Sequence, residues 1–471
     1  ATTEIYTLSQ HDALPIWEIA MEDYFSYTAK LFNPDDANQK PEALKGIRVL
    51  DFSHVIFGPI AARLLADYGA EVIKLELPFY GDLWRPATYW GKYWKHSNPI
   101  WHNITKNKYF LSVNLQLKES KELIYKMAEK ADVVIENFAP GTADAWNIGY
   151  EKISKINPKI IFLSCSTYGQ FGPMRYFPGW DLLAQGASGV LKLNGYPDTD
   201  IYYKLPDYVG DFVPGNFGAL AILMALYHRK KTGKGQYIDM AQTEGLMRML
   251  FNYTYSSVTK KAIGRTGNSD PTMVPASIFK TADDKFLALA CATAEQFHQF
   301  TQAIGRPELA TDARFADTLD RLKPENSSAL TKIATDWIKT KSCAEVISLA
   351  DENNFPAAEV ADDFMIANEE WRRKRGSVVL FKDDVYGNLV IAGPSAQLSG
   401  TPSRTKWLAR PLGYHNRLVL KKFLELSEAE IEILEKKKVI GTFDDRPGLK
   451  PPVYYDLSKD PIYNYGKEVK E

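Results

Sequence analysis

Short apolar segments alternate with amphipathic helical segments through the first half of this chain. Residues 46–76 hold one complete unit, in which strands at 47–50 and 71–75 flank a helical stretch. Pro59 stands in the first turn of that helix, where proline is tolerated, and Gly69 follows its last turn. The pattern continues with a helix at 118–130 and strands at 133–135, 160–164 and 236–241. This alternation predicts an α/β fold with a Rossmann-like parallel sheet covered on both faces.

A change in composition near residue 265 predicts a second, smaller domain. Residues 265–275 are rich in turn formers, residues 277–290 alternate like a hairpin around Asp283 and Asp284, and helical patterns follow at 294–304 and 326–352. The predicted division is a non-native or disordered extension at 1–20, a large α/β domain at 21–240, a linker helix at 241–264, a small α+β domain at 265–360, a linker and return to the large domain at 361–440, and a C-terminal arm at 441–471.

Composition excludes several functional classes. A formal net charge of -1 and a pI near 6.8 give no electrostatic footprint for nucleic acid or a membrane surface. The three cysteines are widely spaced and odd in number, so we expect no disulfide framework, no metal site and a cytoplasmic location. The longest apolar run, 217–226, is too short to span a membrane and predicts a buried helix. Residues 1–20 lack the pattern of a signal peptide, and we expect the native chain to start at Met21.

One carboxylate, Asp181, stands at the start of a helix of small residues at 179–189, after a glycine-rich turn at 168–173. A helix N-terminus favours the ionised form of such a carboxylate. Asp181 therefore has two interpretations. It is an N-cap, the commonest use of Asp in this position, or it is a nucleophile, because carboxylates form covalent intermediates in several enzyme classes.

A series of short motifs, through its order and spacing, resembles the class III CoA-transferase family, which includes formyl-CoA transferase and the CoA-transferases of carnitine and benzylsuccinate metabolism. The resemblance covers roughly residues 44–415. The matching segments lie at 44–52, 58–59, 64–74, 81–85, 107–108, 132–141, 157–158, 179–189, 231–236, 267–268 and 355–357.

The resemblance implies an acyl-CoA:carboxylate CoA-transferase, with two interlocked chains in the family fold. Asp181 would attack a donor acyl-CoA such as succinyl-CoA and pass through an aspartyl anhydride and an aspartyl-CoA thioester. Coenzyme A and its acyl thioester are then the substrates, and neither ATP nor a metal is needed. Backbone N–H groups around Tyr168, Gly169 and Gln170 are candidate donors to the oxyanion that forms.

The resemblance also implies residues that contact CoA. Its phosphates need cations, for which the candidates are Lys74, Arg85, Lys106 and Lys108; the alternative for each is a solvated surface residue. The segment Glu136, Asn137 and Phe138 is expected to border the adenine or pantetheine, although Phe138 would fit a core position equally well.

Further positions are candidates for a substrate pocket: His54, Ile56, Gly267 and Asn268. The family often holds Gln where this chain has Ile56, so a side-chain hydrogen bond is missing there, which predicts a more apolar acceptor or weaker catalysis. The 267–268 segment is shorter than the glycine-rich lid of relatives. An aromatic-rich insert at 84–101, with His96 and His102, either packs in the core or walls a pocket for a bulky acid.

Two other functions remain open. An α-methylacyl-CoA racemase shares the fold but carries His before the Asp, where this chain has Trp180. A non-catalytic subunit of a heteromeric transferase is compatible with Ile56 and the altered lid, and Asp181 argues against it. The expected partners are thus small acyl-CoA and carboxylate substrates and a second, identical or related chain.

Overall fold

A computed structural model describes residues 14–86, 97–250 and 252–442 of the chain. The described residues fall into two compact units. The first contains 14–184, 208–246 and 370–442, and the second contains 185–207 and 247–369. The predicted small domain, 265–360, lies inside the second unit.

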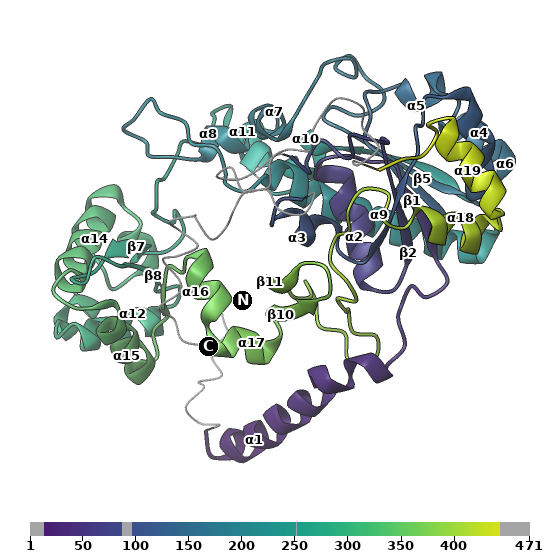
Figure 1. Cartoon of the computed structure of the whole chain (residues 1–471). Coiled ribbons are helices and arrows are strands. Elements are labelled where there is room, and N and C mark those ends of the chain that lie inside the picture. Colours follow the sequence, from purple (N-terminus) through teal and green to yellow (C-terminus); the bar gives the residue numbers. More distant parts are fainter. Residues whose placement is uncertain (1–13, 87–96, 251, 443–471) are drawn as a thin grey trace, which may run out of the picture. The chain divides into compact units, whose positions relative to one another are not determined.

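A six-stranded parallel sheet forms the centre of the first unit (Figure 1). Its strands are β1 (Arg48–Asp51), β2 (Glu71–Glu76), β3 (Lys108–Ser112), β4 (Val133–Glu136), β5 (Ile161–Ser166) and β6 (Gln236–Ala241). They lie in the order β3-β2-β1-β4-β5-β6. The chain runs outward from β1 to β3 and then returns to the other side of β1, so β1 and β4 flank the topological switch point. The predicted α/β fold with a Rossmann-like sheet is confirmed.

Helices cover both faces of this sheet because the strand residues alternate in direction. Val49, Val133 and their neighbours pack under α2 (Phe57–Asp67) and α9 (Val209–Thr232). Leu50, Val134 and their neighbours pack on the opposite face of the sheet. The helices of that face are α4 (Lys121–Glu129), α6 (Tyr150–Ile156), α18 (Asn416–Leu424) and α19 (Glu428–Lys436).

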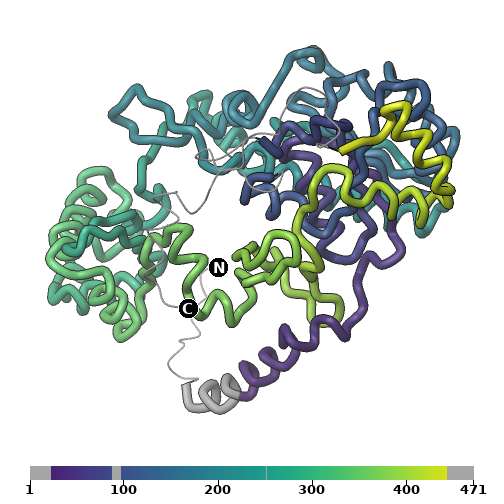
Figure 2. Tube along the Cα trace, in the orientation of Figure 1, coloured from purple at the N-terminus to yellow at the C-terminus, as the bar shows by residue number. Residues whose placement is uncertain are grey.

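The C-terminal part of the chain returns to the first unit and protects its edge strand. The ring Nδ1 of His415 accepts a hydrogen bond from Phe110 N–H at 2.9 Å, and Asn416 Oδ1 accepts one from Ser112 N–H at 2.8 Å. Side-chain acceptors therefore satisfy N–H groups of β3 that would otherwise be open to another strand. Figure 2 traces this yellow C-terminal stretch beside segments of the first half of the chain.

Helix α9 is the long apolar helix that the sequence predicts, extended at both ends. It packs closely on α2: a side chain at Gly215 would lie 2.8 Å from the carbonyl oxygen of Phe57. By length and composition alone α9 could also cross a membrane, but 44% of its most apolar window is buried within the fold. We interpret it as a core helix.

The second unit contains a three-stranded antiparallel sheet made of β7 (Ala276–Lys280), β8 (Phe286–Ala290) and β9 (Ala357–Glu359). The strands β7 and β8 form the predicted hairpin. The helical pattern at 326–352 divides into α14 (Pro324–Ile338) and α15 (Cys343–Asn353), because Ser342 and Glu345 form a capping box that starts a new helix.

The other elements are short or peripheral. The helices are α1 (Leu14–Leu31), α3 (Trp101–Thr105), α5 (Thr142–Ala145), α7 (Asp181–Ala187), α8 (Val190–Leu193), α10 (Gln242–Met247), α11 (Asn252–Thr259), α12 (Ala294–Ala303), α13 (Thr318–Arg321), α16 (Asp363–Asn368) and α17 (Glu370–Arg375). Among the described residues, 3-10 turns lie at Pro34–Gln39, Lys118–Ser120 and Pro307–Ala310, and β10 (Val378–Asp383) pairs with β11 (Gly387–Ala392).

A fully buried ion pair joins β1 to β3 beneath α2. Lys108 Nζ lies 2.8 Å from Asp51 Oδ2 and also donates to the carbonyl of Pro59 at 2.8 Å. Replacing Lys108 with Met leaves the Asp51 carboxylate buried without this partner. We expect Lys108→Met to lower the free energy of unfolding by about 3–5 kcal/mol, measured by urea denaturation.

The double variant Asp51→Asn with Lys108→Met should recover part of that loss, because neither charge is then buried. A matched control is Lys155→Met on α6, whose exposed pair with Glu151 should leave the unfolding midpoint nearly unchanged. A Lys108→Met protein as stable as the wild type would contradict a structural role for the pair.

Candidate active site

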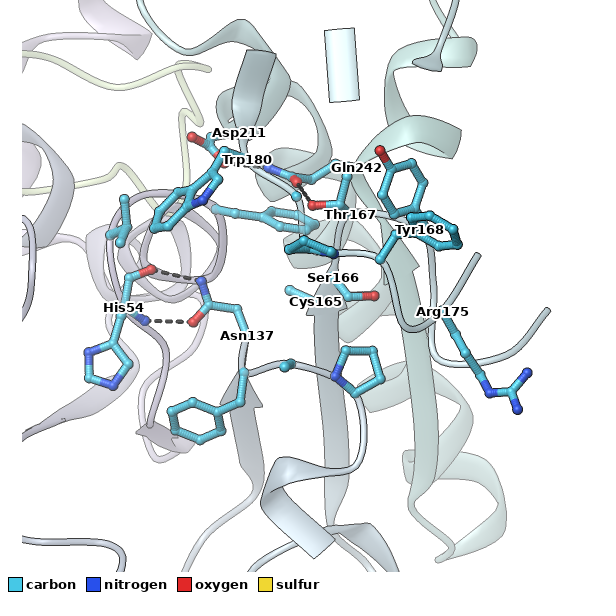
Figure 3. Close-up of a pocket in the computed structure, with 18 of the residues that line it drawn as sticks. His54, Asn137, Cys165, Ser166, Thr167, Tyr168, Arg175, Trp180, Asp211 and Gln242 are labelled. Carbon is cyan, nitrogen blue, oxygen red and sulfur yellow. Dashed lines mark hydrogen bonds between the residues drawn. The ribbon is translucent and has the colours of Figure 1, made fainter. Parts of the chain in front are cut away.

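A cavity of about 470 Å³ lies at the carboxyl ends of β1, β4 and β5, beside the switch point (Figure 3). Ligands of doubly wound sheets bind in this crevice. The loops after β1 and β4 are joined across it by two hydrogen bonds. His54 N–H donates to Asn137 Oδ1 at 2.7 Å, and Asn137 Nδ2 donates to the carbonyl of His54 at 2.8 Å.

The loop after β1 holds a strained backbone on the cavity wall. Val55 has a φ of 67°, a conformation that β-branched residues rarely adopt. Its N–H donates to Asp82 Oδ1 at 3.0 Å. Asp82 is in turn paired with the fully buried Lys74 at 2.9 Å, and Lys74 also donates to the carbonyl of Ser53. This ion pair therefore fixes the cavity wall.

The carboxylate of Asp181 is held at the N-terminus of α9. Asp181 begins α7, is 8% exposed, and its Oδ1 accepts a hydrogen bond from Gly210 N–H at 2.7 Å. Gly210 lies in the first turn of the 24-residue α9, so the helix dipole and a free backbone N–H favour the negative charge. Asp181 is not among the residues that line the cavity, whereas its neighbour Trp180 is.

A second carboxylate, Asp211, lies on the cavity wall one residue after Gly210. It is 7% exposed, and one oxygen accepts a hydrogen bond from Gln242 Nε2 at 2.5 Å. Burial, followed by the negative charge of Asp181, raises the pKa of Asp211 to about 8. Sequence analysis did not select Asp211. The sequence signal for Asp211 is an acid in the first turn of a strongly apolar helix. Burying a carboxylate there costs free energy, so its presence indicates a role.

The three residues predicted to donate hydrogen bonds to the oxyanion differ in position and contacts. Tyr168 lines the cavity, next to Thr167 and Ser166. Gly169 takes a left-handed φ of 86°, and the N–H of Gln170 donates to Asp239 Oδ2 at 2.9 Å. That N–H is therefore engaged within the protein, and an oxyanion role for the turn stays a prediction.

The cations predicted to contact CoA lie in the interior, each at most 2% exposed. Their burial excludes the alternative of a solvated surface residue, because acids and carbonyls distant in sequence pair with them. Lys74 pairs with Asp82, Lys108 with Asp51, and Arg85 with Glu76 at 2.6 Å, while Lys106 donates to Ala392 O and Thr405 Oγ1. A phosphate contact at these residues would require a pair to open, so the placement favours a structural role, and the CoA contact stays a prediction.

The remaining predicted residues differ in position. Asn137 and Phe138 line the cavity with His54, while the Glu136 side chain turns inward and accepts from Phe138 N–H at 2.7 Å. Ile56 is buried against Ile60 and Trp101 rather than on the wall.

Other predicted pocket residues are not among those that line this cavity. Gly267, with Asn268 after it, belongs to the second unit, where a side chain at 267 would meet the ring of Tyr196 at 2.6 Å. His102 is buried against Tyr386, and burial lowers its pKa to about 3. His96 and the rest of 87–96 lie outside the described residues.

Arg175 supplies the guanidinium on the cavity wall, and the described wall holds no Lys or other Arg. It is half-buried, with hydrogen bonds to Gly172 O at 2.9 Å and Tyr176 Oη at 2.6 Å. Neither partner is an acid, so its charge can serve an anion. Within the described part of the chain, no group of three or more His, Cys, Asp or Glu side chains could hold a metal ion.

Comparisons with known proteins all point to one family. Residues 44–416 match CoA-transferase family III. The chain is 30% identical, over 86% of its length and 100% of the relative, to the succinyl-CoA–D-citramalate CoA-transferase of Chloroflexus aurantiacus. It is 33% identical, over 84% and 98%, to the beta subunit of the succinyl-CoA–L-malate CoA-transferase of that organism. A CAIB/BAIF family protein from Brucella suis shares the fold with a TM-score of 0.72 at 27% identity, covering 82% of this chain and 100% of that one.

Burial of Glu136 predicts a pH-dependent stability. Burial raises its pKa to about 7, above the ordinary value of 4.5. The folded state holds this proton more tightly than the unfolded state, so the stabilisation is present below pH 4.5 and is lost as pH rises through 7. At about 1.4 kcal/mol per pH unit the total is on the order of 3 kcal/mol.

We expect Glu136→Gln to lack this pH-dependent loss of folding stability. In thermal melts the melting temperature of the variant should therefore rise relative to that of the wild type between pH 5 and pH 8. The exposed Glu432→Gln on α19 is the matched control and should follow the wild type. Parallel curves for Glu136→Gln and wild type would contradict the shifted pKa.

Proposed function

This chain belongs to CoA-transferase family III, and from that premise we propose that it moves CoA from succinyl-CoA to a small dicarboxylic acid through intermediates bound to an aspartate. The observation that carries the proposal is a pair of carboxylates, Asp181 and Asp211, beside a cavity at the switch point of the sheet. The two relatives named for succinyl-CoA act with dicarboxylic acids, which supports this substrate class.

The chemistry balances without a metal or an added nucleotide. A carboxylate oxygen of the enzyme attacks the thioester carbon, the C–S bond breaks, and CoA leaves as the thiolate with a mixed anhydride left behind. The thiolate then attacks the aspartyl carbon, the donor carboxylate leaves, and an aspartyl-CoA thioester remains. The acceptor carboxylate attacks that thioester, and the thiolate released attacks the acceptor acyl carbon, which regenerates the aspartate.

We assign the attack to Asp181, the residue that the sequence predicts. Asp181 is 8% exposed, against 7% for Asp211, and the preceding Trp180 lines the cavity. One oxygen of Asp181 accepts the N–H of Gly210 in the first turn of α9, where the helix dipole favours a negative charge. Burial and then the charge of Asp181 raise the pKa of Asp211 to about 8, so Asp211 is largely protonated at neutral pH and is the weaker nucleophile.

Two observations bear on the alternative functions. A racemase needs an acid and a base on opposite sides of the substrate carbon, and the position before Asp181, where a racemase carries His, holds Trp180 on the cavity wall. A purely supporting subunit has no need for a buried carboxylate on its cavity wall. Because one relative is named as a beta subunit, the tests below use this chain alone.

Covalent trapping identifies the attacking carboxylate. The protein is incubated with succinyl-CoA, treated with hydroxylamine and digested with trypsin. Residues 176–192 hold Asp181 and residues 205–229 hold Asp211, so the two sites fall on different tryptic peptides. We expect the label on the 176–192 peptide, its absence in Asp181→Asn, and a fall in transfer activity of at least about a thousandfold in that variant.

Asp211→Asn serves as the matched variant and should keep the label on the 176–192 peptide at reduced rate. A label on the 205–229 peptide would give the role to Asp211 instead. Active transfer with neither peptide labelled would contradict a covalent aspartyl mechanism. Failure of transfer with every donor, together with exchange of the α-proton of a 2-methylacyl-CoA, would replace the transferase by the racemase.

Arg175 is expected to bind an anionic group of CoA. Arg175→Gln should raise KM for succinyl-CoA and for acetyl-CoA about tenfold with little change in kcat, because a charge-assisted hydrogen bond to phosphate is lost. Arg306→Gln, at an exposed site of the second unit, is the control. A KM rise confined to succinyl-CoA would place the succinyl carboxylate at Arg175 and contradict the phosphate contact.

A further inference from the structure

The backbone of α9 binds the carboxylate of Asp181 directly. Asp181 Oδ1 accepts a hydrogen bond from the N–H of Gly210 at 2.7 Å. Trp180, which precedes Asp181, and Asp211, which follows Gly210, both line the cavity (Figure 3). The hydrogen bond therefore lies next to the cavity wall.

The first turn of α9 divides its N–H groups between two acceptors. A helix offers no internal partner to its first N–H groups. The N–H groups of Asp211 and Phe212 donate to the carbonyl of Tyr208, at 2.8 and 2.9 Å. The N–H of Gly210 donates to the side chain of Asp181 instead, at the positive end of the dipole of a 24-residue helix.

The absence of a side chain at Gly210 permits this close approach. A Cβ there would lie 2.7 Å from Asp181 Oδ1 and 2.9 Å from the backbone carbonyl oxygen of the same residue. Because the second contact is with the backbone, a larger residue at 210 would displace the start of α7 and not only a flexible side chain. Glycine at this position therefore sets the distance between the helix end and the carboxylate.

From this contact we propose that the N–H of Gly210 is the oxyanion donor for the steps in which the aspartyl carbon of Asp181 is itself attacked. The inference rests on the proposed function, because it concerns the same covalent intermediates. In both the anhydride and the aspartyl-CoA thioester, Oδ1 is the carbonyl oxygen of Asp181. It stays on the donor that binds it in the free enzyme.

The electron flow of these steps places negative charge on that oxygen. When the CoA thiolate attacks the anhydride, a C–S bond forms at the aspartyl carbon and the C=O π electrons move to Oδ1. The C=O bond then re-forms, and succinate leaves with the electrons of the broken C–O bond. Attack of the acceptor carboxylate on the thioester charges the same oxygen again before the thiolate leaves. A donor that is already in place stabilises the oxyanion in both steps.

Two neighbouring groups support this assignment. The N–H of Gln170, in the turn that the sequence predicts as the oxyanion donor, is already bound to Asp239 Oδ2 at 2.9 Å. Burial, more than the charge of Asp181, raises the pKa of Asp211 to about 8. Asp211 is therefore largely protonated at neutral pH and adds little negative charge against an oxyanion at the same helix end.

The test is an amide-to-ester replacement in the full chain, Gly210→glycolate, introduced by nonsense suppression. It removes the N–H and adds no side chain. We expect kcat for CoA transfer from succinyl-CoA to fall at least about a hundredfold, with KM changed less than about twofold.

The step affected is identified from the covalent adducts. The protein is mixed with succinyl-CoA without an acceptor, quenched with acid before the adducts equilibrate, and measured by intact-protein mass spectrometry. The anhydride carries a succinyl group, and the thioester carries CoA. Because attack of the thiolate is slowed, the ratio of succinyl adduct to CoA adduct should rise at least about tenfold over the wild type.

Two further variants keep the result interpretable. Gly233→glycolate, at the other end of α9, removes an N–H that donates to the carbonyl of Arg229, also at 2.7 Å, and should leave kcat and the adduct ratio unchanged. Gly210→Ala keeps the N–H but displaces Asp181 from it, and should raise the adduct ratio in the same direction. Melting temperatures of all variants are compared first, and Gly210→Ala carries the test if the ester variant does not fold.

A wild-type adduct ratio in the Gly210 variants would overturn the oxyanion role, even if kcat falls, and would leave the proposed function standing. Absence of transfer and of both adducts in the wild type with every donor would overturn the proposed function itself. A ratio shifted toward the CoA adduct would also contradict the inference, because it would mean that the N–H hinders attack on the aspartyl carbon.

Discussion

The site depends on the buried ion pair between Lys74 on β2 and Asp82. Both side chains are fully buried, so each needs the other to offset its loss of hydration. Asp82 also accepts hydrogen bonds from the N–H groups of Val55 and Trp84, and Lys74 donates to the carbonyl of Ser53. The pair thus fixes the loop that follows β1. His54 on that loop is hydrogen-bonded to Asn137 across the switch point.

Helix α9 gives two neighbouring carboxylates different environments. Asp181 receives a backbone N–H from the first turn of the helix, which favours its charge. Asp211 belongs to that same turn but faces the cavity, where burial and the charge of Asp181 favour the neutral form. Two identical functional groups can serve different roles when their surroundings separate their proton affinities. One helix end therefore both fixes a charge and presents a second carboxyl group to the cavity.

The sequence predicts the sheet well because strand and helix periods are local properties. The alternation at 46–76 corresponds to β1, α2 and β2, and the hairpin around Asp284 corresponds to β7 and β8. The site is harder to predict, because its contacts join distant residues. Lys108 and Asp51 are 57 positions apart, and Gln242 and Thr167 are 75 apart. From the sequence alone a lysine is expected at the surface. Only the fold shows that Lys108 pairs with an acid in the interior.

The polar contacts of the site also suggest how this scaffold separates stability from chemistry. The fully buried pairs lie on β1, β2 and β3, on one side of the switch point. The carboxyl group on the wall and its amide and hydroxyl partners come from β5, α9 and α10, on the other side. A substitution among the latter changes hydrogen bonds that face a cavity, whereas one among the former exposes an unpaired charge to the core. The half with β5 and β6 can therefore vary its polar groups at less cost to folding.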